Sequence, residues 1–212
     1  MPTNLGAPLF KYLRREHATR LLAEGILRVG TLHEYRDVGR YGNRVGDSKE
    51  GSKGTMLKVD RLDVMSKDDL PEFVRNSFEV GSGKFTFINS TFLVTEDSPD
   101  FYIYSVTKRF SAEAMRNLGY DACVRIDDPA SFFRALSHSL RHKGSFQGLH
   151  SCIYMPRYTP PDKQHNIHPA LIKEPEYEGQ QEQRAIWQPA SSKPRPVILA
   201  CRKARNYCSR VD

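Results

Sequence analysis

The clearest chemical signal is the stretch YEGQQEQRAIW, residues 177–187. A polar, glutamine-rich turn runs directly into an apolar segment, which predicts that a strand begins close to Glu182. Gln180 and Glu182 lie two positions apart and point the same way if the strand has begun by then. At the edge of a cleft, the carboxylate could bind a sugar hydroxyl and stabilise positive charge at an anomeric carbon during N-glycosidic cleavage, while the amide positions a second reactant. The competing interpretation pairs Glu182 with Arg184 or another surface arginine and leaves the glutamines in solvent.

Hydroxyl groups and a cation recur on two other expected strands. Ser105 and Thr107 are two apart in DFYIYSVT, and hydroxyls at a strand end can anchor a catalytic carboxylate or a ribose. Lys11 and Tyr12 in the first expected strand offer a cation for a phosphate and a ring for a flat base. The alternatives are ordinary strand-end hydroxyls and a surface lysine beside a core tyrosine.

A glycine-rich segment, GDSKEG, places Asp47 and Glu50 three apart. We expect these acids to pair with Arg36 or another basic side chain at the mouth of a cleft, rather than to bind a metal. Arg36 is also a candidate for binding a pyrophosphate. His165 and His168 have a spacing seen in metal sites, but no second pair of ligands accompanies them, so no metal is expected.

Regular elements capable of positioning these residues alternate along the chain. The pattern predicts strands at 8–13, 26–32, 55–64, 84–94, 100–107, 121–126, 149–158, 183–189 and 195–201, and helices at 16–25, 66–78, 111–119 and 128–144. Residues 33–54 and 159–179 are expected to be loops, and the strands 84–94 and 100–107 an antiparallel pair. The fold class predicted for residues 1–212 is a single α+β domain, with short helices packed on a largely antiparallel or mixed sheet.

Composition narrows the classes of partner. The 212 residues carry a net charge of +7, which favours an anionic partner such as a nucleotide or a nucleic acid. No apolar run approaches the length of a membrane span, and the N-terminal order of apolar and basic residues is wrong for a secretory signal, so a cytoplasmic protein without a membrane partner is expected. The four cysteines form no C-x-x-C pair and are expected to be reduced thiols.

Part of the basic excess lies at residues 193–212, which are expected to form a basic C-terminal tail. Arg202, Lys203 and Arg205 could attract polyanions weakly, or the tail could be a solvated end.

Four segments of the chain together resemble a widespread bacterial and phage family of uncharacterised proteins. They are LFKYLRREHATRLLAEGILRVGTLHEYRD, GDSKEG, FYIYSVTKRFS and KEPEYEGQQEQRAIW. In that family a tyrosine-rich strand and a glycine-terminated helix come first, and a glutamate-arginine-tryptophan strand comes late. The match runs from Leu9 to about Pro189 through short motifs, and it implies a shared fold more directly than a function.

A more distant likeness is to the ADP-ribosyltransferase fold, which implies a split sheet. The order of motifs is similar: a nucleotide-contacting first strand, a helix ending LLAEG, a strand with Ser105 and Thr107, and a late strand entered through Gln180 and Glu182. The resemblance implies NAD as a substrate, with Glu182 at the 2′-hydroxyl of the nicotinamide ribose and Gln180 positioning the target. Lys11 stands where the family has arginine or histidine.

Two functions are therefore expected from different classes. The first is an NAD-dependent ADP-ribosyltransferase or NAD glycohydrolase, with catalytic Glu182 and Gln180 and an acceptor that is protein, nucleic acid or water. Its NAD-binding residues would be Lys11, Tyr12, Arg36, Ser105 and Thr107. The second is a non-enzymatic module whose basic cleft binds a nucleotide or nucleic acid. Convergence of Glu182, Ser105 and Lys11 on one concave site favours the first.

Overall fold

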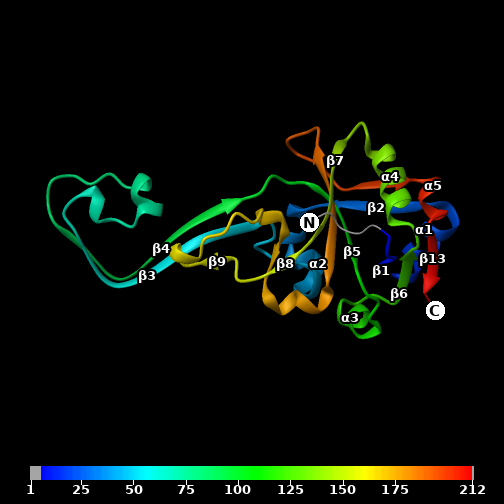
Figure 1. Ribbon diagram of the computed structural model, residues 1–212, viewed down its shortest axis with the longest axis horizontal. Helices are drawn as coiled ribbons and strands as arrows, with labels where there is room; N and C mark the ends of the chain where they lie inside the picture. The colour runs from blue at the N-terminus through cyan, green and yellow to red at the C-terminus, as the bar shows by residue number, and fades with distance from the viewer. Residues whose placement is uncertain (1–5, 212) are drawn as a thin grey trace.

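A branched antiparallel sheet organises the computed structural model, which describes residues 6–211 (Figure 1). Eight strands take part, and every pairing within this sheet is antiparallel. They are β1 (Leu9–Leu13), β2 (Ile26–Thr31), β5 (Tyr102–Thr107), β6 (Ala122–Ile126), β7 (Gly144–Ser151), β11 (Glu182–Pro189), β12 (Val197–Ala200) and β13 (Cys208–Val211). The predicted α+β class and its largely antiparallel sheet are confirmed.

Strand β5 is the point at which the sheet splits. One of its edges pairs with β11 along its whole length, from Tyr102 to Thr107. The other edge is shared, because β2 pairs with Tyr102 and Ile103 whereas β1 pairs with Thr107. The two branches therefore leave β5 on either side of Ser105, and the backbone there has no strand partner on that edge.

Three helices pack on one face of this sheet: α1 (Arg15–Glu24), α4 (Pro129–Leu140) and α5 (Arg202–Arg205). A further short helix, α3 (Ala112–Asn117), has no buried residue. Helix α4 begins with an Asp128 side-chain cap and buries Phe132, Phe133, Leu136 and Leu140 in the main core, which also contains Tyr104 and Trp187 of β5 and β11. Helix α1 ends at Gly25, as predicted; its φ of 72° is the left-handed conformation that glycine adopts without strain.

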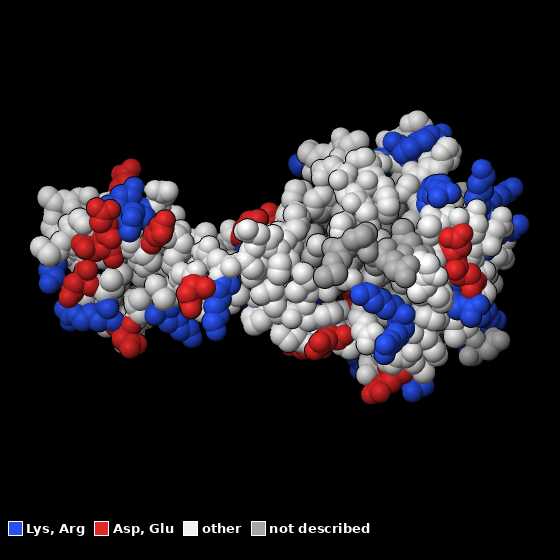
Figure 2. All heavy atoms as spheres, viewed as in Figure 1, with Lys and Arg blue, Asp and Glu red and all other residues white. Residues whose placement is uncertain are grey.

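A long hairpin projects from this body. It consists of β3 (Ser52–Val64) and β4 (Phe85–Asp97), and it ends in a lobe with two short 3₁₀ helices, η2 (Lys67–Asp69) and η3 (Glu72–Ser77) (Figures 1 and 2). The lobe has its own small apolar cluster, which includes Val64, Leu70, Val74 and Phe92. The two runs 84–94 and 100–107 were expected to pair with each other, and this is wrong. The mostly exposed β4 pairs with β3, while β5 is largely buried on both faces and belongs at the centre of the sheet.

The segment 33–54, expected to be a loop, contains regular structure. A 3₁₀ helix, η1 (His33–Arg36), is followed by α2 (Val38–Val45), which is interrupted by a non-helical Gly42. The Asp37 side chain caps the start of α2 by accepting a hydrogen bond from the backbone N–H of Arg40. This cap stabilises a helix in a segment whose many glycines had predicted a loop.

The remaining short elements lie between β7 and β11 in the chain. They are β8 (Ile153–Tyr154), β9 (Tyr158–Thr159), β10 (Ile172–Lys173), η4 (Pro161–Lys163), η5 (Pro169–Leu171) and η6 (Pro175–Gln180). Strand β10 pairs in parallel with β8, and β9 pairs in parallel with the base of β3. Within residues 6–211, no helix has both the length and the apolar character needed to cross a bilayer.

The expected C-terminal tail is a folded part of the body. Strand β12 pairs with β2, β13 pairs with β6, and Ala204 of α5 is fully buried in the main core. Apolar residues at positions 197–208 supply this packing, while the side chains of Arg202, Lys203 and Arg205 in α5 stay exposed.

Deletion of residues 202–212 is therefore expected to destabilise the protein. The deletion removes an edge strand and the buried Ala204 of α5, and a loss of about 3 kcal/mol would lower the melting temperature by roughly 6–12 °C for a chain of this size. The charge-only control Arg202→Gln/Lys203→Gln should melt like the wild type. Equal melting temperatures of the truncated and full-length proteins, measured by circular dichroism, would contradict this packing.

Candidate functional site

The site is built on one face of the paired strands β5 and β11. In their antiparallel register, Glu182 lies opposite Thr107 and Arg184 opposite Ser105. Residues directly opposite one another point to the same face, so these four polar side chains lie on one side of the sheet. The helix α4 packs on the other side, where Tyr104 and Trp187 point. The alternation of polar and apolar residues in both strands produces this separation.

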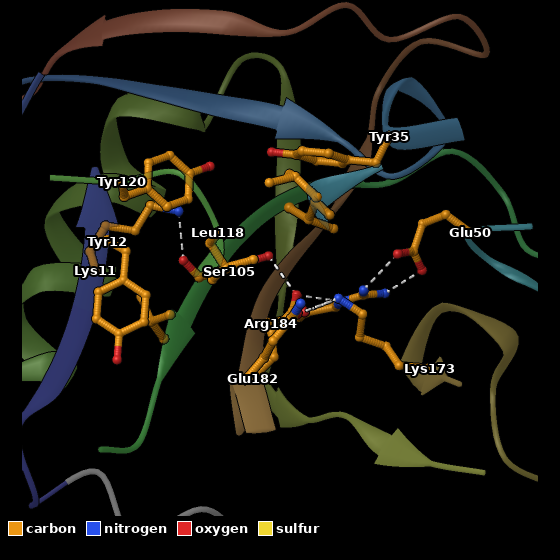
Figure 3. A pocket seen from close by; sticks show the side chains of 14 residues that line it. Lys11, Tyr12, Tyr35, Glu50, Ser105, Leu118, Tyr120, Lys173, Glu182 and Arg184 are labelled. Carbon is orange, nitrogen blue, oxygen red and sulfur yellow. Dashed lines mark hydrogen bonds and ion pairs between the residues drawn. The ribbon is translucent and has the colours of Figure 1, made fainter. Parts of the chain in front are cut away.

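Glu182 is held by three side chains (Figure 3). One carboxylate oxygen, Oε1, accepts from the Ser105 hydroxyl at 2.6 Å and from Arg184 Nε at 2.8 Å. The other, Oε2, accepts from Lys173 Nζ at 2.7 Å, and the same ammonium donates to Gln180 Oε1 at 2.8 Å. The amide and the carboxylate predicted to share a site are thus joined through a lysine that lies at the end of β10.

The charge state of Glu182 follows from these partners. Burial by itself raises its pKa, but the charges of Arg184 and Lys173, with their hydrogen bonds, outweigh burial and hold the pKa of Glu182 well below its usual value. Glu182 is only 8% exposed. The carboxylate is therefore ionised at neutral pH, and two cations balance its charge inside the protein.

Arg184 connects Glu182 to the GDSKEG segment. Its guanidinium makes a two-pronged ion pair with Glu50, at 2.9 and 3.0 Å. Arg157, which is completely buried, pairs with Asp47 and lies 3.6 Å from Glu50. The prediction that these acids meet basic side chains is confirmed.

The arginine predicted to meet these acids lies elsewhere. Arg36 donates to the backbone oxygen of Glu50 and pairs with Asp97 at 3.0 Å, at the base of the hairpin. Its guanidinium does not line the pocket around Glu182. A turn of 3₁₀ helix, η1, sets its direction, and this turn was not foreseen from the sequence.

Lys11 occupies the split in the sheet. Its ammonium donates to the backbone oxygen of Ser105 at 2.7 Å, which satisfies the carbonyl that lacks a strand partner, and it lies 4.6 Å from the centroid of the Tyr104 ring. Burial lowers the pKa of Lys11 to about 8, against the attraction of Glu182, which raises it. The amine is therefore a cation at neutral pH that loses its charge at moderately alkaline pH.

A pocket of about 100 Å³ lies among these groups. Lys11, Ser105, Lys173, Gln180 and Glu182 contribute its polar wall. Tyr35 and Tyr120 lie across the pocket from Glu182 (Figure 3). This volume is smaller than the ~150 Å³ of a cavity that holds one benzene ring, so the pocket encloses only part of a ribose or a base and the rest of a ligand would extend through the mouth.

Most of the predicted site residues converge on this pocket. Gln180, Glu182, Ser105, Lys11 and Tyr12 all line it, as the convergence hypothesis requires. Thr107 is buried beside them but does not line the pocket, and its hydroxyl donates to the backbone oxygen of Arg109. The chemical roles of these residues stay predictions.

Other lining residues were not identified from the sequence. Lys173 comes from a proline-rich segment without a strand pattern, and Tyr35 and Tyr120 lie in or beside short turns. Arg184 was considered only as a surface partner of Glu182, yet it is 1% exposed. Its place two residues after Glu182 in a strand was the one signal that both side chains share a face.

The described residues hold no group of three or more His, Cys, Asp or Glu side chains placed to bind a metal ion. His168 accepts from the backbone N–H of Ala170, which gives it a structural role at the start of η5.

No protein-family model, no curated protein and no solved structure matches this chain.

Proposed function

We propose that the chain cleaves the N-glycosidic bond of NAD in the Glu182 pocket and passes the ADP-ribosyl group to water or to an acceptor. One observation carries the proposal: an ionised Glu182, oriented by the Ser105 hydroxyl, lines a pocket of about 100 Å³. The late-strand and middle-strand motifs that resemble ADP-ribosyltransferases supply these same two residues.

The contacts suggest how the substrate would bind. The two oxygens of Glu182 differ, because Oε1 is fixed by Ser105 and Arg184 whereas Oε2 is held by Lys173 alone. A ribose hydroxyl that replaces the Lys173 ammonium at Oε2 would leave the carboxylate oriented and free one of its two compensating cations. The displaced ammonium, or that of Lys11, can then bind a phosphate at the mouth of the pocket.

Cleavage of the N-glycosidic bond needs the protein to stabilise a developing positive charge, and it needs no covalent bond between the protein and the substrate. As the bond from C1′ of the ribose to the nicotinamide nitrogen breaks, its electron pair leaves with nicotinamide and positive charge develops on the sugar. A nearby carboxylate stabilises that charge, and an oxygen or nitrogen nucleophile then bonds to C1′ and gives up its proton. Gln180, two positions before Glu182, would position that nucleophile.

The direct test incubates the purified protein with NAD labelled in its nicotinamide or its adenine. The proposal expects release of free nicotinamide in buffer or with cell lysate, and transfer of the adenine label to an acceptor where one is present. Binding of NAD or ADP-ribose without release would instead support the non-enzymatic nucleotide-binding module. Absence of both turnover and binding would reject a nucleotide site in this pocket.

Affinity for the nucleotide is expected to depend on the charge of Lys11. Because the pKa of Lys11 is about 8, its ammonium becomes neutral as the pH rises through that value and its attraction for a phosphate is lost. A hydrogen bond to a charged group contributes about 1.5–3 kcal/mol, so affinity for ADP-ribose should fall roughly tenfold between pH 7 and pH 9.5. Lys11→Arg stays charged and should show a flat profile by calorimetry; equal profiles for both proteins would exclude Lys11 from the phosphate contact.

A further inference from the structure

A second basic surface lies on the side of the sheet opposite the Glu182 pocket. A groove of about 530 Å³ runs between α4 and the segment that joins β12 to α5. Arg134 and His138 of α4 and Arg202 and Lys203 of α5 line it, with Tyr207 at one wall. Among the described residues, no acidic side chain lines this groove.

The basic side chains continue along α4. Arg134, His138 and Arg141 are spaced four and three residues apart, so they lie on one face of the helix and its C-cap. Arg141 lines a neighbouring cavity of about 490 Å³, again without an acidic lining residue in the described part of the chain. Figure 2 shows several blue side chains at this end of the body, with a smaller red group among them. The stripe formed by Arg134, His138 and Arg141 extends roughly 10 Å along the helix at 1.5 Å per residue. This length is greater than the contact with a single phosphate group requires.

These cations are available for a ligand. Arg134, Arg141, Arg202 and Lys203 are exposed, and none of them makes an ion pair with a described residue. Elsewhere on the body, basic side chains such as Arg28 and Arg125 are paired with acids. An unpaired row of positive charge attracts the regularly spaced negative charges of a polyanion.

An exposed aromatic ring accompanies the stripe. Phe146 of β7 lines the same cavity as Arg141 and is 41% exposed, although its inner side packs on Trp187 with ring centroids 5.2 Å apart. This packing holds the ring in one orientation with part of it facing solvent. Rigid exposed rings beside a row of cations are the two features with which proteins bind single-stranded nucleic acids, because bases stack on the ring while the cations follow the backbone.

We propose that the surface formed by α4, α5 and Phe146 binds single-stranded nucleic acid. Arg134, Arg141, Arg202 and Lys203 contact successive phosphates, and Phe146 stacks on one base. The segment 193–212 contributes only part of this surface, which explains why the sequence pointed to the C-terminal end and missed α4 and β7.

The test measures binding of a fluorescent 20-nucleotide oligothymidine to the full-length protein by anisotropy between 50 and 200 mM salt. Single-strand binding loses affinity with a slope of about −0.7 per neutralised phosphate. The variant Arg134→Gln/Arg202→Gln/Lys203→Gln should therefore bind at least tenfold more weakly at low salt, with a salt slope smaller in magnitude by about 2. The matched control Lys58→Gln/Lys67→Gln/Lys84→Gln removes the same charge from the hairpin and lobe and should bind like the wild type.

A second pair of measurements isolates the ring. Phe146→Leu keeps an apolar side chain against Trp187, and it should weaken oligothymidine binding roughly tenfold, as expected for loss of one stacked base, without changing binding of inorganic polyphosphate. If both triple variants weakened oligothymidine binding equally, binding would depend only on the net charge of the protein, and the proposal would be overturned. Polyphosphate or anionic lipid vesicles that bind as tightly as the oligonucleotide would also overturn it. Measured well below its melting temperature, Glu182→Gln should leave oligothymidine binding unchanged, so failure here is separate from failure of the NAD proposal.

Discussion

Glu182→Gln is expected to reduce nicotinamide release by roughly a hundred- to a thousandfold, the effect of losing one well-placed electrostatic group at a developing charge. The substitution preserves the shape of the side chain and removes its negative charge. Nicotinamide release is measured with saturating NAD, well below the melting temperature of the variant. Gln180→Ala should spare hydrolysis of NAD more than transfer to an acceptor, because Gln180 would position the nucleophile and does not face the developing charge.

The same substitution is also expected to destabilise the protein. Glu182 is buried between Lys173 and Arg184, and removing one partner of a buried ion pair typically costs about 3–5 kcal/mol. Breaking a surface ion pair would cost far less stability. Glu182 does pair with Arg184, but the interpretation that placed this pair at the protein surface is wrong, because both residues are buried. Stability loss alone therefore does not establish catalysis, and the two effects must be measured separately.

Asp47→Asn provides the matched control. Asp47 pairs with the buried Arg157, but it does not line the pocket. The variant should lose stability while nicotinamide release per folded molecule stays close to wild type. If Glu182→Gln and Asp47→Asn retain equal turnover, the carboxylate has only a structural role.

Arg184→Met is expected to cause the largest loss of stability of any single substitution at the site. The change leaves Glu50 and Glu182 without their shared guanidinium, and an uncompensated buried charge costs about 3–5 kcal/mol or more. Urea unfolding at pH 7 measures the difference. Arg61→Met, which removes an exposed arginine paired with Asp63 on the hairpin, should leave the unfolding midpoint nearly unchanged.

The pH dependence of this loss gives a second signature. The pKa of Glu182 is held low in the folded wild type, so its ion pairs contribute stability above the unfolded value of about 4.3, and this contribution is lost as pH falls toward the folded pKa. The difference between wild type and Arg184→Met should therefore shrink below about pH 4. A difference that is small at pH 7, or constant with pH, would show that the buried carboxylates do not depend on Arg184.

The sequence by itself determined the faces of the strands that carry the site. Because side chains alternate along a strand, the spacing of Ser105 and Thr107 and of Glu182 and Arg184 assigns each pair to one face whatever the strands pair with. The helix stop at Gly25 was also predictable, since it needs only the left-handed conformation that glycine adopts easily. These features depend on neighbours within a few residues.

Only the tertiary structure decided which of those faces meet and which charges are buried together. The pairing of β5 with β11 joins residues 77 apart at Ser105 and Glu182, and the contact of Arg184 with Glu50 joins residues 134 apart. Lys173 reaches Glu182 from a segment with no periodic pattern, and the exposed β4 was mistaken for the partner of β5. Such long-range contacts are fixed by burial of both sheet faces and by the need of each buried charge for a partner, and neither requirement is visible in the local order of residues.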